Sequence, residues 1–342
     1  MTKTNTNLEW ADNLRFIATI FVIIIHVIFP VVQNYATVDT GAWHTANIIE
    51  SLCRSAVPIF VMLSGALLLG KQENIDTFYN KRIKKIGLPF LCWSFIYFLV
   101  AYISEFVIGS STQDKFLWFV NNLKNGSCYH LWYLYMILGL YLIIPYLSKI
   151  VPSLKNKDYY FFITIWTISL FLNFPAIKDY FPNFDITFFT GYIGYLLLGF
   201  FLSDILSKQL SFRFGMIIFI VGWLTTFLLT WISSSSEQKF VPTYYNYLSP
   251  NIALIAVGLF IMIIKSSQSN NLYSRISKII SDYSYGIYLN HVLFITIGFK
   301  LGLSWKTLNP FLGVSLTFLF VILLSVTFVW ISEKLKLRKF FG

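Results

Sequence analysis

Charged residues are scarce in this chain of 342 residues: Asp, Glu, Lys and Arg together make up 12% of it. Ordinary soluble domains contain about 25% charged residues and about 45 to 50% apolar ones. Hydrophobic residues account for 56% of this sequence. A soluble globular protein is therefore excluded, because so few charged groups could not cover the surface of a chain this apolar.

Cysteine is also rare, and no pair among Cys53, Cys92 and Cys128 has the Cys-x-x-Cys spacing. An odd number without that spacing indicates neither a disulfide framework nor a metal site. Internal repeats, low-complexity tracts and long outer loops are missing as well. The first apolar run lacks the positive segment and the small-residue cleavage site of a signal peptide, so we expect it to stay as a helix. These absences predict one compact membrane-embedded domain over residues 1–342.

Apolar runs of about the 20 residues needed to cross a bilayer recur along the whole chain. Several contain Pro or Gly, which membrane helices tolerate where neighbouring groups satisfy the backbone. The runs predict an all-α, polytopic membrane protein with about ten transmembrane helices in one bundle. The predicted spans are residues 12–32, 48–69, 86–108, 129–147, 158–174, 186–206, 212–231, 247–265, 283–301 and 311–332.

The Lys and Arg residues alternate across these spans. With the N-terminus inside, the inner segments hold 18 of them and the outer segments hold six, while Arg15 and Arg54 lie within spans. The positive-inside rule then places both termini in the cytoplasm and the chain in the inner, cytoplasmic membrane. The net charge of +11 is thus explained by topology, and nucleic acid is not an expected partner.

Arg15 and His26 are both ionisable and both lie in the first span, where such groups are costly and usually face the bundle interior or an aqueous cavity. Their step of eleven residues is about three helical turns, so both side chains leave the same face, about 16 Å apart along the axis. Taken singly, Arg15 could be a snorkelling anchor and His26 could make an interhelical hydrogen bond. The shared face favours a joint site.

Glu50 and Arg54 in the second span are spaced i, i+4 and can pair on one face. Either they form a structural ion pair, or Arg54 lies at the depth of His26 and disfavours its protonation, keeping it available as a base. Pro58 is interpreted as a kink, and Ser64 with Gly65 as a close helix contact.

Four cations, Lys81, Arg82, Lys84 and Lys85, precede the third span on the cytoplasmic side. Such clusters often bind anionic lipid headgroups. A phosphorylated cosubstrate arriving from the cytosol would also explain them, and Arg82 is the best candidate because a guanidinium can hold phosphate with two hydrogen bonds.

Three further residues are candidate cavity groups. His130 opens the fourth span among aromatic residues typical of the membrane interface, so it belongs either to that belt or to a site. His291 lies near the middle of the ninth span, either as a packing residue or as part of a central cavity. Glu105, near the outer end of the third span, is a possible acidic partner.

In combination, these stretches resemble the large family of integral membrane acyltransferases called acyltransferase 3, in particular its short WecH-like branch of O-acetyltransferases. The matching stretches occur in the family's order over nearly the whole chain. They are RFIATIFVIIIH, VPIFVMLSGALL, KRIKKIGLPFLCWS, YHLWYLYMILGLYL and SYGIYLNH. Where the family often has two arginines in the first cytoplasmic loop, this chain has Arg82 among lysines.

The resemblance implies ten helices, no tightly bound cofactor, and acyl-CoA, expected to be acetyl-CoA, as a cosubstrate on the cytoplasmic side. The acceptor would be a hydroxyl of a cell-envelope polysaccharide or glycolipid. Arg15 and His26 would be the essential pair. Arg15, with Lys81, Arg82 and Lys85, would hold donor phosphates while the pantetheine arm reaches His26.

His26 would then act as the general base, or would carry the acyl group transiently. Arg54 could stabilise the oxyanion, a role that comes from its position and not from the resemblance.

Two other classes of function remain open from the residues. A transporter or flippase of envelope glycan precursors would also have ten helices and a polar interior, but inverted repeats with interrupted helices at matching positions are not evident. A structural partner in an export complex would leave Arg15 and His26 unexplained.

Overall fold

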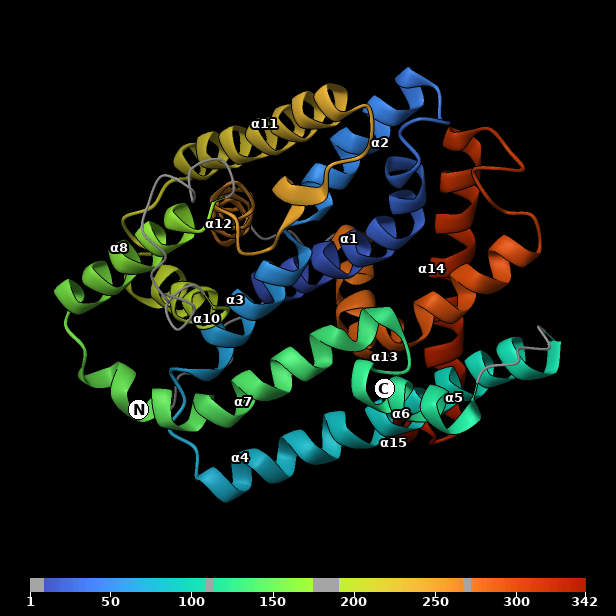
Figure 1. The fold of residues 1–342 in the computed structure, drawn as a ribbon. Coiled ribbons are helices and arrows are strands. Elements are labelled where there is room, and N and C mark those ends of the chain that lie inside the picture. The colour runs from blue at the N-terminus through green and yellow to red at the C-terminus, as the bar shows by residue number, and fades with distance from the viewer. Residues whose placement is uncertain (1–8, 109–113, 175–190, 267–271) are drawn as a thin grey trace.

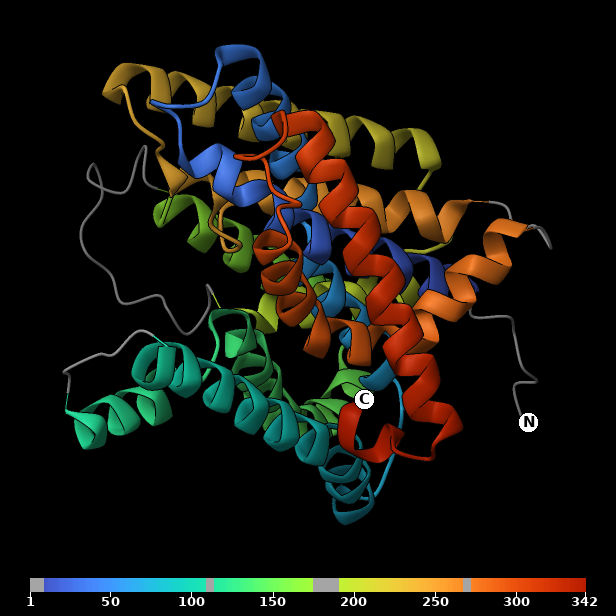
Figure 2. The same ribbon diagram turned by 90° about the vertical axis from the view of Figure 1, so that its right-hand side faces the viewer.

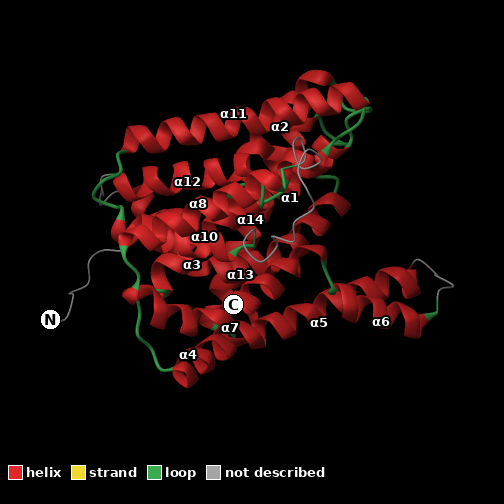
Figure 3. Ribbon diagram, turned by 60° about the vertical axis from the view of Figure 1, so that its left-hand side comes forward, coloured by secondary structure: helices red, strands yellow, loops and turns green. Residues whose placement is uncertain are grey.

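A computed structural model describes residues 9–108, 114–174, 191–266 and 272–342, and these residues form helices and loops without any strand (Figure 3). The first half contains α1 Glu9–Gln33, α2 Thr40–Cys53, α3 Ala56–Leu68, α4 Ile75–Arg82, α5 Leu88–Tyr102, α6 Lys115–Asn125, α7 Trp132–Ile150 and α8 Asn156–Leu172. The second half contains α10 Ile193–Phe200, α11 Phe212–Glu237, α12 Pro250–Lys265, α13 Leu272–Lys300, α14 Pro310–Lys334 and α15 Arg338–Phe341. Figure 1 shows α1 in the middle of the bundle.

The distribution of side chains on α11 is the reverse of that on a helix of a soluble protein. Its buried residues are small or hydroxylated: Gly215, Gly222, Thr226, Thr230 and Ser234. Large apolar residues such as Ile217, Val221 and Ile232 are exposed. Small residues let membrane helices approach closely, while apolar ones face lipid. The all-α membrane bundle predicted from the sequence is therefore confirmed.

Among the described residues, seven helical segments are long and apolar enough to cross a membrane, and they coincide with seven of the ten predicted spans. They are Glu9–Gln33, Thr40–Leu68, Ile75–Val107, Tyr129–Ser153, Phe212–Glu237, Pro242–Lys265 and Pro310–Lys334. The other three predicted spans coincide with α8, which has 17 residues, with a short apolar helix at Ile193–Ile205, and with α13. Residues 186–190 of the sixth predicted span lie outside the described residues.

The second span is broken into α2 and α3 at Arg54 and Ser55. Pro58 has no N–H, so the carbonyl of Arg54, four residues earlier, loses the helical hydrogen bond it would otherwise accept. The kink predicted at Pro58 is thus present, and the helix is interrupted one turn before the proline, at Arg54.

The close contact predicted at Ser64 and Gly65 is confirmed, since α3 crosses α10 there. A Cβ atom added at Gly65 would lie 1.7 Å from the carbonyl oxygen of Leu196, and one added at Gly199 would lie 1.9 Å from that of Met62. Only glycine permits this approach of two backbones.

Helices α1 and α13 run parallel and in register. Ser274 donates to Glu9, Ser277 donates to Asn13 at 2.5 Å, Arg15 donates to Ser281 at 2.7 Å, and the ring of His26 lies 5.2 Å from that of His291. The residue numbers in these pairs differ by 264 to 266. The register places His26 and His291 at the same height in the bundle.

The chain reverses at the end of α14. Lys336 has a positive φ of 58°, the amide of Leu337 donates to the carbonyl of Ser332 at 2.7 Å, and that of Lys336 donates to Glu333 at 3.0 Å. This pattern is a Schellman motif, which ends a helix and turns the chain. Figure 2 shows the C-terminal segment lying beside the helices of residues 75–102, and α15 packs on α5.

Candidate active site

A cavity of about 620 Å³ lies between α1, α3, α7 and α13 and the basic segment that joins α4 to α5. Three segments predicted to be cytoplasmic from their charge meet at its walls, together with Arg15 of the first predicted span. The cationic side chains lining it are Arg15, Arg82, Lys84, Lys85, Arg338 and Lys339, and Asp282 is the acidic one. Its volume is in the range of pockets that hold cofactors and other small molecules.

Arg15 lies in the wall of this cavity, in a small polar network. Its guanidinium donates to Asp12 at 3.2 Å and to Ser281 at 2.7 Å, and Ser281 donates to Asp12 at 2.6 Å. The side chain of Arg15 keeps 27% of its surface exposed. It is positioned at the cavity wall and still accessible to a second anionic group.

The basic segment before α5 divides into residues that face the cavity and one that does not. Lys84 and Lys85 lie on a π-helical turn at Ile83–Gly87, a local widening often found at functional sites. Both line the cavity with Arg82. Lys81 points away and pairs with Glu73, and this hydrogen bond holds the pKa of Glu73 below its usual value.

Arg82 has aromatic neighbours where an acidic partner would be expected. Its guanidinium lies 5.0 Å from the ring centre of Phe78 and 5.6 Å from that of Tyr141. Within the described chain no ion pair neutralises Arg82, and its Nε atom is buried without a hydrogen bond. A charged guanidinium held in this way is prepared to bind an anion.

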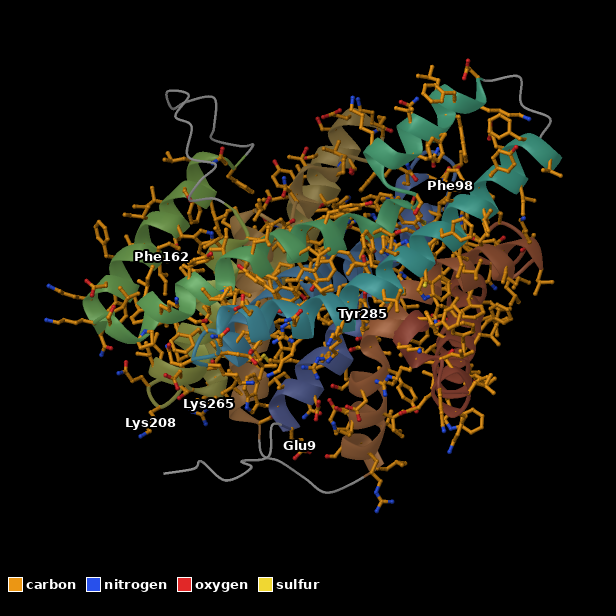
Figure 4. The ribbon with its side chains drawn as sticks, turned by 90° about the horizontal axis from the view of Figure 1, so that it is seen from below. Glu9, Phe98, Phe162, Lys208, Lys265 and Tyr285 are labelled. Carbon is orange, nitrogen blue, oxygen red and sulfur yellow. The ribbon has the colours of Figure 1, made fainter. Side chains whose placement is uncertain are left out.

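The α13 wall of the cavity is a helical stripe that leads toward the bundle interior. Ser281, Ser284, Tyr285 and Tyr288 line the cavity, and their spacing of three or four residues places them on one face. Figure 4 shows Tyr285 near the centre of the molecule. The ring of Tyr288 lies 5.9 Å from that of His291. The cavity therefore ends one aromatic ring away from the histidines described next, and His26 itself is not part of its lining.

Three histidines from three helices form a cluster next to this inner end. Ring centres are 5.2 Å apart for His26 and His291, 5.1 Å for His130 and His291, and 6.4 Å for His26 and His130. His130 and His291 are 1% and 0% exposed, whereas His26 is partly exposed. His130 is thus inside the bundle and not at the lipid-facing surface. Among the described residues no group of His, Cys, Asp and Glu side chains is arranged to hold a metal ion.

The hydrogen bonds of His291 fix its tautomer. Its Nδ1 lies 2.7 Å from the carbonyl oxygen of Tyr288, which can only accept, so Nδ1 carries the proton and Nε2 has a lone pair. That Nε2 is buried without a partner, as is Nε2 of His130. His130 contacts the Cys128 sulfur through Nδ1 at 3.2 Å, and Tyr288 donates to its carbonyl. Buried polar atoms without a partner are rare in folded proteins, so these two nitrogens mark the cluster as a candidate functional site.

Arg54 lies in an aromatic cage beside the break between α2 and α3. It pairs with the fully buried Glu50 at 2.6 Å, and its guanidinium lies 4.8 Å from the ring centre of Tyr245, 5.2 Å from that of Phe29 and 5.8 Å from that of Tyr247. Phe29 is three residues beyond His26 on α1. The structure thus places Arg54, paired with Glu50, against a side chain that lies one helical turn from His26.

Glu105 is not part of either group. It lies in a π-helical turn at Ile103–Ile108 after α5, and no hydrogen bond or ion pair joins it to the histidines in the described part of the chain. Asp12, the α13 stripe, Arg338 and Lys339 also lie at the cavity or its wall, and the sequence did not predict them as site residues. The stripe could have been found from its spacing toward His291. Nothing local to the last residues indicates that they return to the cavity.

The fold and the site together define a class of protein. It is a multi-pass membrane protein in which a basic cavity, lined by two parallel helices, leads to a cluster of histidines inside the bundle. Residues 8–332 match the model of the acyltransferase 3 family, described as an acyltransferase domain, and the chain belongs to that family. It is also 23% identical over 343 residues to a protein of Bacillus subtilis strain 168 named "Putative membrane-bound acyltransferase YfiQ", covering 94% of this chain and 91% of that protein. No solved structure matches. The protein is therefore a membrane-bound transferase of acyl groups, as the resemblance predicted.

Proposed function

We propose that this protein transfers an acyl group, in particular acetyl, from acyl-CoA on the cytoplasmic side to a hydroxyl of a cell-envelope polysaccharide or glycolipid, as in the WecH-like branch. The observation that carries the proposal is the cavity that joins a cationic mouth to the neighbourhood of the three clustered histidines. A donor with several phosphates at one end and a thioester at the end of a long arm matches this cavity, because its charge would lie at the cationic mouth and its thioester near the histidines.

Arg82 and Lys85 would bind donor phosphates, and Arg15 would join them at the wall. Arginine and phosphate form charge-assisted hydrogen bonds in pairs, which fixes orientation as well as adding binding free energy. The eleven-residue step from Arg15 to His26 covers about 16 Å, a distance that the pantetheine arm can span along the α13 stripe. The thioester is then presented beside Tyr288 and the histidine cluster.

His26 is the candidate base because it is the partly exposed member of the cluster. It would take the proton of the acceptor hydroxyl while the hydroxyl oxygen attacks the thioester carbonyl carbon. Collapse of the tetrahedral intermediate breaks the carbon–sulfur bond, and the thiolate takes the proton from His26. Positioned proton transfer contributes roughly 10²- to 10⁴-fold to such a rate. Attack by His26 itself, giving an acyl-histidine, is the other route.

Arg54 would stabilise the oxyanion of the intermediate. Its pairing with Glu50 holds the guanidinium in place, and its surroundings, the aromatic cage included, bury all but 13% of its side chain. Both effects favour an electrostatic role, since a fixed charge in a dry site needs no reorganisation during the reaction.

The test is release of free thiol from acetyl-CoA by the purified protein, measured with candidate envelope glycans. Glycan-dependent thiol release with acetylated glycan as the product supports the proposal. Acetyl-CoA that stays intact with every glycan fraction from the native cell envelope would overturn it.

One observation also suits a transporter of glycan precursors: the span broken between α2 and α3 beside a buried ion pair. Reconstituted vesicles distinguish the two functions. A transporter moves labelled glycolipid between leaflets without any acyl donor, whereas an acyltransferase modifies it only when acyl-CoA is supplied.

A further inference from the structure

The C-terminal segment places two cations in the wall of the cavity. After the reversal at Lys336, Arg338 and Lys339 join Arg15, Arg82 and Lys85 around one volume. The match to the family model ends at residue 332, so these two residues lie outside the part of the chain that the family defines. The basic segment before α5 has Arg82 but no second arginine, and Arg338 and Lys339 supply further positive charges to the same cavity.

Several contacts fix the segment against α5, α13 and α14. Arg338 donates to the carbonyl of Asp282 at 2.5 Å and to the carboxylate of Glu333 at 3.1 Å. The indole of Trp93 donates to the carbonyl of Phe341 at 3.3 Å, and the ring of Phe341 lies 5.5 Å from that of Phe328. The segment is therefore a built part of the wall.

Arg338 is balanced by Glu333, but Lys339 adds a positive charge to the cavity wall that nothing among the described residues balances. Asp282, the acidic side chain in the lining, already pairs with Lys278 at 2.7 Å. Lys339 has the ring of Phe340 beside it at 4.9 Å, and no acidic side chain of the described residues lies within ion-pair distance of it. Like charges around one volume repel, and a polyanion bound among them removes that repulsion.

We infer that Arg338 and Lys339 form the second half of the phosphate site for the acyl donor. Arg338 anchors the segment through Asp282 and Glu333, and Lys339 binds a phosphate across the cavity from Arg82 and Lys85. This inference rests on the proposed function in taking a coenzyme A thioester as the ligand.

The experiment measures equilibrium binding of coenzyme A to the purified protein, and the donor KM for acetyl-CoA and for S-acetylpantetheine, which has no phosphate. The variant is Lys339→Ala. The control is Lys336→Asn, which removes a neighbouring charge that does not line the cavity and keeps a residue tolerant of positive φ. Lys339→Arg tests rescue by charge.

Lys339→Ala is expected to weaken coenzyme A binding and raise the KM for acetyl-CoA by about tenfold, the size of one hydrogen bond to a charged group. The KM for S-acetylpantetheine and the behaviour of Lys336→Asn should stay at the wild-type values. Equal effects on both donors, or none on coenzyme A binding, overturn the inference. A wild-type protein that binds coenzyme A through Lys339 but transfers no acyl group would instead refute the proposed function.

Discussion

Among the three clustered histidines, His26 is the partly exposed one, whereas His130 and His291 are almost fully buried. His26→Gln keeps a hydrogen-bonding side chain of similar size but removes the base. We expect kcat for acyl transfer to fall by roughly 10²- to 10⁴-fold, with membrane insertion and donor KM near the wild-type values. Thiol release kinetics on matched protein amounts measure this. Undiminished turnover would leave His26 as a packing residue.

Arg15 is held by Asp12 and Ser281, so its contribution to donor binding competes with an internal ion pair. Arg15→Lys retains the charge but loses the planar fork, and we expect the donor KM to rise about tenfold, the loss of one hydrogen bond to a charged group. Asp12→Asn is the counterpart, since it frees the guanidinium from its internal ion pair and should lower the donor KM. A snorkelling anchor would show neither effect.

The sequence predicted which side chains lie together when they share one helix, because the helical repeat sets their faces. It did not predict contacts between residues that are distant in the sequence. The shared face of Arg15 and His26 follows from 3.6 residues per turn, and the structure places both along α13. Asp12 shares that face too, but a carboxylate in the first turn is also an ordinary helix-terminal charge. No local pattern indicates that His130 contacts His291, 161 residues later, because that distance depends on how α7 packs against α13.

At the scale of elements, the register between α1 and α13 positions the site. Inserting one alanine after Ile20 keeps Arg15 opposite Ser281 but rotates His26 by about 100° and moves it about 1.5 Å. A misplacement of about 1 Å can cost about 10²-fold in rate, so we expect at least that loss in thiol release. An alanine inserted after Ala36, in the exposed loop that follows α1, is the control and should have little effect.

A second insertion separates rotation from displacement. Four alanines placed after Ile20 bring His26 back to about 40° from its original face and move it about 6 Å along the helix axis. If the shared face alone positions His26, this variant should recover part of the activity lost with one alanine. If it stays as inactive, the height of His26 beside α13 is needed as well, and wild-type activity with one alanine would show that the shared face does not position His26.

The break between α2 and α3 is the other element on which the site depends. Pro58→Ala returns an N–H that can bond to the carbonyl of Arg54, making one continuous helix and turning Arg54 out of its cage. We expect activity to fall about 100-fold while thermal stability in detergent is kept or raised. Pro145→Ala in α7 is a matched change of a proline inside a helix, and a similar loss there would mean that proline kinks in general, and not Arg54, determine activity.

Apolar runs predicted most elements, because a helix in the bilayer makes its backbone hydrogen bonds within itself and presents a long stretch of apolar residues to the lipid. They predicted α2 and α3 as one span over 48–69, since hydropathy does not register the lost hydrogen bond at Pro58. The span over 283–301 belongs to α13, which begins earlier, at Leu272, in a polar stretch. Its Ser277 and Ser281 side chains pair with α1, so the polar residues there reflect packing that only the folded bundle reveals.

On the scale of the whole molecule, helix ends that the charge pattern predicts to lie on one side of the membrane also lie together in the fold. Glu9, Lys208 and Lys265, from three segments predicted to lie inside, lie along one edge of the structure, and Phe98 lies at the opposite one (Figure 4). The cations of the cavity come from the same predicted side. A donor from the cytosol would meet all of them at the cavity, which is the geometric basis of the proposed function.

The number of spans depends on α8 and the short helix at Ile193–Ile205. If Lys155, before α8, and Lys208, before α11, both lie inside, then either both intervening segments cross the membrane or neither does. The 17 residues of α8 extend about 26 Å, close to the roughly 30 Å of hydrocarbon. Ten spans require that they cross.

Cysteine labelling in intact cells with a membrane-impermeant maleimide decides between these arrangements. Asn173→Cys, at the exposed end of α8, should react in intact cells, and Lys155→Cys should react only after permeabilisation, each read against the parent with its native Cys53, Cys92 and Cys128 replaced by serine. Labelling of neither variant before permeabilisation would place both ends of α8 inside, and the pair of crossings would be lost together. The site would survive that result, because α1 and α13 still run parallel with an odd number of spans between them, and only the number of helices around them would change.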